Sequence, residues 1–273
     1  MLGGGGVAGI AWMTGLLRGL ADAGLDVTDA DLVVGTSAGA TVGAQLGSGL
    51  ALRELYDRQV EPHLQAHEID PGVDLRSVAG LFSAALDGAG SPAALRRGVG
   101  ERALGTQTVA EGVRRAVIES RLPSHAWPAR TLRIVAVDAT SGEARTFDGT
   151  SGVALVDAVA ASCAVPGVWP PVEIDGRRYI DGGVRSNDNA DYAREASRVL
   201  VVAPLGTEPL FPSEIPLEQA AADLRAGGAE VAIVVPDEAS QAAIGTSPLD
   251  PATRVPAAAA GWAQGRSAAP TWH

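Results

Sequence analysis

Residues 31–39 read Asp-Leu-Val-Val-Gly-Thr-Ser-Ala-Gly, and the fold is organised around them. The apolar run 32–34 is typical of a short buried strand. A segment rich in alanine and glycine follows, so Gly35-Thr36-Ser37-Ala38-Gly39 lies between a predicted strand and a predicted helix. In that context the G-x-S-x-G pattern places a serine on a sharp turn. We therefore predict that Ser37 projects at the carboxyl end of the strand, where the start of the helix favours a developing anion.

A second glycine-rich stretch lies near the start of the sequence, where Gly3-Gly4-Gly5-Gly6-Val7-Ala8-Gly9 precedes a predicted amphipathic helix over 10–23. Such a loop can offer backbone N–H groups as an oxyanion hole. It can also cradle a phosphate, because Gly4-x-Gly6-x-x-Gly9 formally matches the dinucleotide-binding pattern. A third possibility is that these glycines only allow a helix and a strand to pack tightly together. The nearby Ser37 turn favours the oxyanion hole, formed by Gly4, Gly5 and Gly6.

A serine hydroxyl needs a base to become a good nucleophile. The histidines are poor candidates: His63, His67 and His125 lie in segments of unclear structure, and His273 ends the sequence. Asp181 ends a predicted strand, and Gly182 and Gly183 let the backbone turn away from its carboxylate. We therefore predict a Ser37–Asp181 dyad. Asp138, which also ends a predicted strand, is the second choice.

Composition excludes several classes of protein. A hydrophobic content of 46% and a charged content of 19% indicate a globular chain with a substantial core. The net charge of −11, with arginine as the only strongly basic residue type, argues against nucleic-acid binding and against tight docking on anionic membranes. The lone Cys163 fits a reducing, cytoplasmic compartment, and the histidines show no metal-ligand spacing. We expect neither a metal nor a cofactor.

Apolar strands that alternate with helices predict an α/β fold with a mostly parallel sheet. We predict one domain over 1–245, with a helical insertion or cap at 51–130 and a poorly ordered Ala/Pro-rich tail at 246–273. The arginine pairs Arg96–Arg97 and Arg114–Arg115 are interpreted as solvated helix faces. The predicted strands are the following: 32–34, 131–137, 144–147, 172–174, 179–180, 200–203 and 231–235.

Three motifs occur in order: Gly4–Gly9, Gly35–Gly39 and Asp181-Gly182-Gly183. With Ala161–Gly167 and Pro171-Val172 they resemble the patatin-like phospholipase family over residues 2–205. The resemblance implies a three-layer α/β/α fold and lipid acyl hydrolysis through an acyl-enzyme. Ser37 would be the nucleophile, Asp181 the base and Gly4–Gly6 the oxyanion hole. It also implies a lipid or other acyl-ester substrate and transient contact with a membrane surface.

Two features depart from the family pattern. Ala8 stands where the family usually has a basic residue, and only Met1 and Leu2 precede the glycine run, where the family has an apolar strand. From the second feature we expect a start upstream of Met1, or a sheet that lacks one strand and holds the glycine loop loosely. Both features keep open a non-catalytic regulatory or lipid-binding protein on the same fold.

Overall fold

The computed structural model describes residues 1–71, 85, 89–208, 213–268 and 270–272. Part of the predicted cap, residues 72–84, and the terminal His273 lie outside the described residues. The helices are α1 Gly6–Asp22, α2 Ala38–Leu46, α3 Leu52–Val60, α5 Pro92–Gly105, α6 Glu111–Arg121, α7 Leu155–Ser162, α8 Leu217–Ala226, α9 Glu238–Ile244 and α10 Arg254–Ser267. The strands are β1 Leu32–Thr36, β2 Thr131–Asp138, β3 Ala144–Phe147, β4 Val172–Ile174, β5 Arg177–Asp181, β6 Arg198–Val202 and β7 Glu230–Val234.

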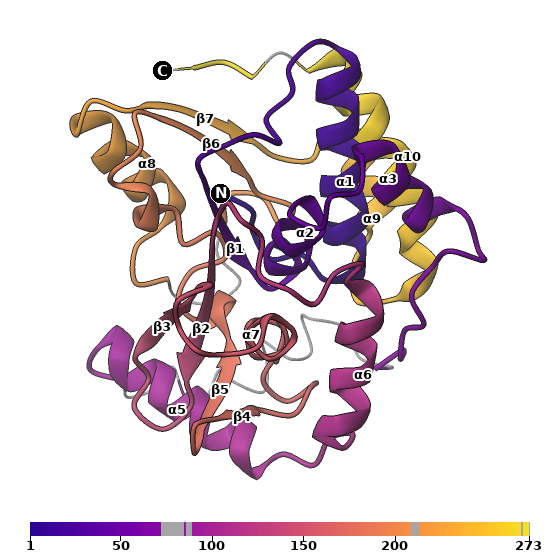
Figure 1. The fold of residues 1–273 in the computed structure, drawn as a ribbon. Coiled ribbons are helices and arrows are strands. Elements are labelled where there is room, and N and C mark those ends of the chain that lie inside the picture. The colour runs from indigo at the N-terminus through magenta and orange to yellow at the C-terminus, as the bar shows by residue number, and fades with distance from the viewer. Residues whose placement is uncertain (72–84, 86–88, 209–212, 269, 273) are drawn as a thin grey trace.

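The sheet is mixed, so the prediction of a mostly parallel sheet is confirmed only in part. β1 pairs with β2 and β6 pairs with β7 in parallel, whereas β2–β3, β2–β5 and β4–β5 are antiparallel. Two of the antiparallel pairs arise from tight hairpins, since β3 returns after a turn at Gly142 and β5 follows the Asp175-Gly176 turn. The third pair, β2–β5, joins strands that are far apart in the sequence. β6 and β7 lie at one end of the sheet in Figure 1, and β4 and β5 lie at the other.

Leu2, in the middle of the Met1–Gly3 segment, helps to join the two parts of the sheet. It bridges Gly35 of β1 and Val202 of β6 in parallel. Its N–H donates to the Val34 carbonyl at 2.9 Å, and its carbonyl accepts from the Thr36 N–H at 3.0 Å. The segment that leads into the glycine run therefore occupies the position of a strand between β1 and β6, and the loop that follows is anchored at its base.

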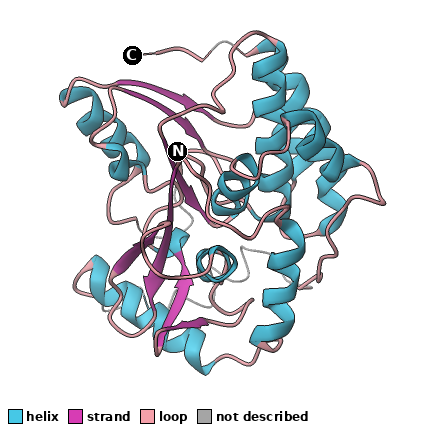
Figure 2. Ribbon diagram, viewed as in Figure 1, coloured by secondary structure: helices cyan, strands magenta, loops and turns pink. Residues whose placement is uncertain are grey.

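Helices pack on both sides of the strands, as Figure 2 shows for α1 and α10 on one side and α8 on the other. The alternation of side chains in β6 explains this arrangement. Val199 and Val201 pack into a cluster with α8, whereas Val202 belongs to the larger core shared with α1, α2 and α10. Within the described ranges, no helix combines the length and the apolar character that a membrane span requires.

Residues 254–267 form α10 and pack along α1, so the prediction of a poorly ordered tail is wrong for this segment. The contact is unusually close because both helices carry glycines at the interface. A Cβ on Gly261 would collide with the carbonyl oxygen of Trp12, and one on Gly265 with that of Leu16. The small residues of this segment give it the composition of a disordered tail. In the folded protein they allow the backbones of α1 and α10 to pack closely together.

The packing of α10 on α1 predicts that Gly261→Ala lowers the free energy of unfolding by about 1–3 kcal/mol, because the added methyl group has no room. Gly112→Ala is the matched control, since a Cβ there meets nothing within 4 Å. It should stabilise the protein by less than about 1 kcal/mol through helix propensity. Urea unfolding of both variants measures the difference, and equal stability of the two would contradict this packing.

Candidate active site

Ser37 lies on a strained turn between β1 and α2. Its backbone has φ 53° and ψ −113°, in a region that non-glycine residues rarely occupy. The turn is tight because neither flanking glycine has room for a side chain. A Cβ on Gly35 would lie 2.6 Å from the Ala40 Cα, and one on Gly39 would collide with the Leu2 carbonyl oxygen. Backbone strain of this kind is concentrated at functional sites.

The end of α7 fixes the backbone of Ser37 from the opposite side. The Ser37 N–H donates to Ser162 Oγ at 2.8 Å, and Ser162 Oγ donates to the Val135 carbonyl of β2 at 2.6 Å. The Cys163 thiol donates to the Ser37 carbonyl at 3.3 Å. These contacts use the Ala161–Gly167 segment that the sequence analysis matched to a family. Its role in holding the serine was not predicted.

Asp181 reaches Ser37 because two strands meet end to end along β2. Thr36, the last residue of β1, pairs with Val135, and Asp181, the last residue of β5, pairs with the adjacent Ala136. A Cβ on Gly182 would collide with the Val135 carbonyl and lie 3.3 Å from the Thr36 Cγ2, so the two strand ends are in contact. The register of β2 therefore sets the distance between the hydroxyl and the carboxylate.

The Asp181 carboxylate is buried, with 5% of the residue exposed. Its Oδ1 accepts from the Gly183 N–H at 2.8 Å, whereas Oδ2 has no hydrogen-bond partner of good geometry. Burial raises the pKa of Asp181 to about 6, although the Gly183 N–H, the Ser37 hydroxyl and the charge of Arg114 act to lower it. At neutral pH the group is mostly ionised and has an unused acceptor oxygen near the serine.

The glycine loop passes directly beside Ser37. A Cβ on Gly4 would lie 3.8 Å from the Ser37 Cβ, and one on Gly9 would lie 3.5 Å from the Ala38 Cβ. The Gly4 N–H donates to the Asn187 carbonyl at 2.9 Å, so it is already engaged. The N–H groups of Gly5 and Gly6 make no hydrogen bond within the described part of the chain. Of the three predicted oxyanion donors, these two are available for a ligand.

A cavity with about 440 Å³ of empty space joins these groups. Its polar part consists of Ser37, Asp181, Asn187 and the glycine loop, and the rest of its wall is mainly apolar. This combination of a few convergent polar groups and an apolar wall is typical of a small-molecule site. The apolar lining residues are Val165, Pro166, Val184, Leu205 and Leu249.

The loop after Asp181 is held in place from both ends. Asn189 adopts a left-handed conformation with φ 46°, and its Nδ2 donates to Thr36 Oγ1 at 3.0 Å and to the Gly182 carbonyl at 3.3 Å. The loop is thus tied to the end of β1, beside Ser37. Sequence reasoning missed Asn189, because nothing in its local sequence marks it.

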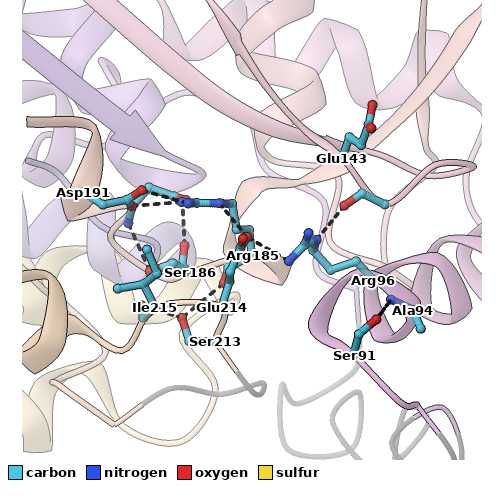
Figure 3. Close-up of polar contacts among 12 residues, drawn as sticks. Ser91, Ala94, Arg96, Glu143, Arg185, Ser186, Asp191, Ser213, Glu214 and Ile215 are labelled. Carbon is cyan, nitrogen blue, oxygen red and sulfur yellow. Dashed lines mark hydrogen bonds and ion pairs between the residues drawn. The ribbon is translucent and has the colours of Figure 1, made fainter.

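Arginines fasten the same loop to α5, as Figure 3 shows. Arg185 forms a two-pronged pair with Asp191 at 2.8 and 2.9 Å and also reaches Glu214 at 3.1 Å. Arg96 donates to the same Glu214 at 2.9 Å and to the Gly142 carbonyl at 2.5 Å. Arg96 and Arg114 are both buried, so the interpretation of Arg96–Arg97 and Arg114–Arg115 as solvated pairs is wrong for the first member of each.

The alternative bases lie away from this site. His63, His67 and His125 are exposed, and His125 packs against Glu119 of its own segment. Asp138 accepts from the N–H groups of Thr140 and Ser141, which makes it part of a turn. Among the described residues, Asp181 is therefore the candidate base that reaches the cavity with Ser37.

The raised pKa of Asp181 predicts a pH-dependent gain in stability for Asp181→Asn. The folded protein must carry a buried charge above about pH 6, whereas the unfolded chain ionises near 3.8, so wild-type stability falls as the pH rises through 6. The extra free energy of unfolding of Asp181→Asn over wild type should increase by about 1 kcal/mol between pH 5 and pH 8. Urea unfolding at both pH values measures it, and a gain that is the same at each would contradict the raised pKa.

Comparison with known proteins places the chain in a family. A family model described as patatin-like phospholipase matches residues 1–194, which include the glycine loop, Ser37 and Asp181. The solved structure of VipD from Legionella pneumophila matches with 15% sequence identity and a TM-score of 0.38, over 66% of this chain and 44% of that one. The chain thus spans less than half of VipD, and no curated protein matches. On the extent of the family match, the chain belongs to the patatin-like phospholipase family.

Proposed function

We propose that the protein is a serine acyl hydrolase that cleaves fatty-acid esters of lipids, in the manner of a phospholipase A or lipid esterase, through a Ser37–Asp181 dyad. The family supports lipid acyl hydrolysis in general. One observation carries the finer assignment: a buried carboxylate with an unused oxygen lies beside a strained serine, in a cavity bordered by two unpaired amides.

The proposed reaction starts with attack of Ser37 Oγ on the ester carbonyl while Asp181 takes the hydroxyl proton. The carbonyl oxygen becomes an oxyanion that accepts from the Gly5 and Gly6 N–H groups, at the positive end of the α1 dipole. Collapse of the tetrahedral intermediate expels the alcohol, which receives the proton from Asp181. The same carboxylate then takes a proton from water as the water attacks the acyl-serine. Collapse of this second intermediate releases the fatty acid, and Asp181 returns the proton to Ser37 Oγ.

The lining of the cavity supports an acyl-chain substrate. Apart from the catalytic groups, its wall consists largely of aliphatic side chains, which would bury hydrocarbon in place of water.

Ala8 is completely buried in the core behind the glycine loop, and its N–H donates to the Pro248 carbonyl at 2.9 Å. The position where the family usually carries a basic residue is therefore neutral and closed in this chain.

The dyad predicts that Ser37→Ala and Asp181→Asn each reduce turnover of a short acyl ester by about 10³-fold or more, because each removes a group that acts in the same step. Ser37→Ala should also abolish labelling by a fluorophosphonate. His125→Ala, an exposed imidazole, is the control and should keep wild-type activity. Full activity of Asp181→Asn would overturn the dyad. Failure of well-folded wild-type protein to react with the probe would favour a non-catalytic, lipid-binding role.

The pKa of about 6 predicts the pH dependence of catalysis. Since the base must be ionised to accept the serine proton, kcat/KM should rise tenfold per pH unit below about pH 6 and level off above pH 7. Measurement between pH 4.5 and 8.5 with an uncharged ester checks the profile. A rate that falls as the pH rises through 6 would require the protonated form of Asp181 and would contradict its role as base.

A further inference from the structure

A cluster of buried charges lies behind the catalytic turn. Glu68 accepts from Arg121 through both oxygens, at 2.8 and 2.6 Å, and from Arg254 at 2.7 Å. The side chains of Glu68, Arg121 and Arg254 are only 3–6% exposed. Burial alone would raise the pKa of Glu68, but the surrounding arginines lower it, so the carboxylate is ionised. These two arginines already make three hydrogen bonds to the carboxylate.

Arg114 is a third arginine in this cluster, and within the described ranges its side chain makes no hydrogen bond to an acid. Its side chain is 7% exposed, and its Nη1 lies 3.9 Å from Glu68 Oε2, too far for a hydrogen bond. Its Nε and Nη1 are buried and make no hydrogen bond. The guanidinium stacks on Trp169, with Cζ 3.8 Å from the ring centroid. The stacking holds the guanidinium plane in place and leaves the Nε and Nη1 donors unsatisfied.

The charges of this cluster do not balance. Arg114, Arg121 and Arg254 surround one carboxylate, Glu68, and the charge of a second acid, Asp181, also acts on Arg114. Counted over the residues that the structure describes, one positive charge in this cluster remains uncompensated even with Asp181 ionised. This excess is buried inside a chain whose net charge is −11. A buried charge without a partner is costly, which indicates that an anion completes the cluster.

Arg114 faces a cavity that also reaches the nucleophile. This second cavity has about 330 Å³ of empty space and is lined by Ser37, Glu68, Arg114, Arg121, Cys163 and Trp169, among others. It shares Gly6, Ser37, Val165 and Leu249 with the apolar cavity described above. Ser37 therefore stands at the junction of an apolar space and a cationic space. An ester bound at Ser37 likewise has two sides, an acyl chain and an alcohol.

We propose that the Arg114 cavity is an anion-binding site that takes a phosphate group on the alcohol portion of the ester. The acyl chain then lies in the apolar cavity. A guanidinium offers parallel donors that match phosphate oxygens, and its stacking on Trp169 reduces the freedom lost on binding. Arg114 would then determine the preference for esters whose alcohol portion carries a phosphate. Its role in catalysis rests on the proposed acyl hydrolase function, whereas its capacity to bind phosphate does not.

Binding tests the site without the reaction. Calorimetry on Ser37→Ala protein compares glycerol 3-phosphate, inorganic phosphate and glycerol as probes. Glycerol 3-phosphate should bind saturably, inorganic phosphate more weakly and glycerol undetectably. When Arg114→Met is introduced into the Ser37→Ala protein, the Kd for glycerol 3-phosphate should rise at least tenfold, because a charge-assisted hydrogen bond is lost. Arg115→Met is the matched control on the same helix, since that side chain is 40% exposed and does not line the cavity. An unchanged Kd in Arg114→Met would overturn the proposal.

Kinetics then tests selectivity with two esters of the same acyl chain, one on glycerol 3-phosphate and one on glycerol. Wild-type protein should prefer the phosphorylated ester, and Arg114→Met should lower the ratio of the two kcat/KM values at least tenfold through KM. Arg115→Met should leave the ratio unchanged. Should Arg114→Met fail to fold, Arg114→Lys keeps the charge without the planar fork and should lower the ratio several-fold.

The two proposals fail in different ways. Turnover of both esters with a ratio that Arg114 variants do not change would overturn the phosphate site alone. Arg114-dependent binding of glycerol 3-phosphate without turnover of either ester would support the site and overturn the acyl hydrolase function. Binding of inorganic phosphate as tight as that of glycerol 3-phosphate would identify a site for free phosphate and contradict its role in holding an ester.

Discussion

The pairing of β2 with two strand ends is the constraint on which the site depends. Val135 pairs with the last residue of β1 and Ala136 with the last residue of β5, so residues from distant parts of the sequence meet at adjacent positions. The Val135 carbonyl also accepts from Ser162 Oγ, which in turn accepts from the Ser37 N–H. One short stretch of β2 therefore sets both the position of the serine backbone and the approach of the carboxylate.

The site combines rigidity with unsatisfied polar groups. The strained backbone at Ser37, the free oxygen of Asp181 and the unpaired amides of Gly5 and Gly6 each cost folding free energy. The surrounding structure offsets that cost through the core, the Leu2 bridge and the Arg96–Glu214–Arg185 contacts. Groups held in place but not yet bonded are suited to stabilise a transition state, because they need no reorganisation.

Local patterns predicted much of the framework. The strand before Ser37, both hairpins and the glycine-bounded turn follow from neighbouring residues, and their sequences carry the signal directly. The parallel character of the sheet was predicted only in part, because the antiparallel pairing of β2 with β5 depends on contacts between residues far apart in the sequence. Ser162, Asn189 and Arg114 were not recognised as parts of the site, since their roles come from contacts with residues far away in the sequence. The order of α10 depends likewise on the glycines of α1, which composition alone does not reveal.

A crystal structure of the protein after reaction with a fluorophosphonate tests the central claim most directly. The account predicts a covalent bond between phosphorus and Ser37 Oγ, with the phosphonyl oxygen within hydrogen-bond distance of the Gly5 and Gly6 N–H groups. The Asp181 carboxylate should face the modified serine across the ends of β1 and β5. Phosphorus on another residue, or a histidine ring between Ser37 and Asp181, would contradict it.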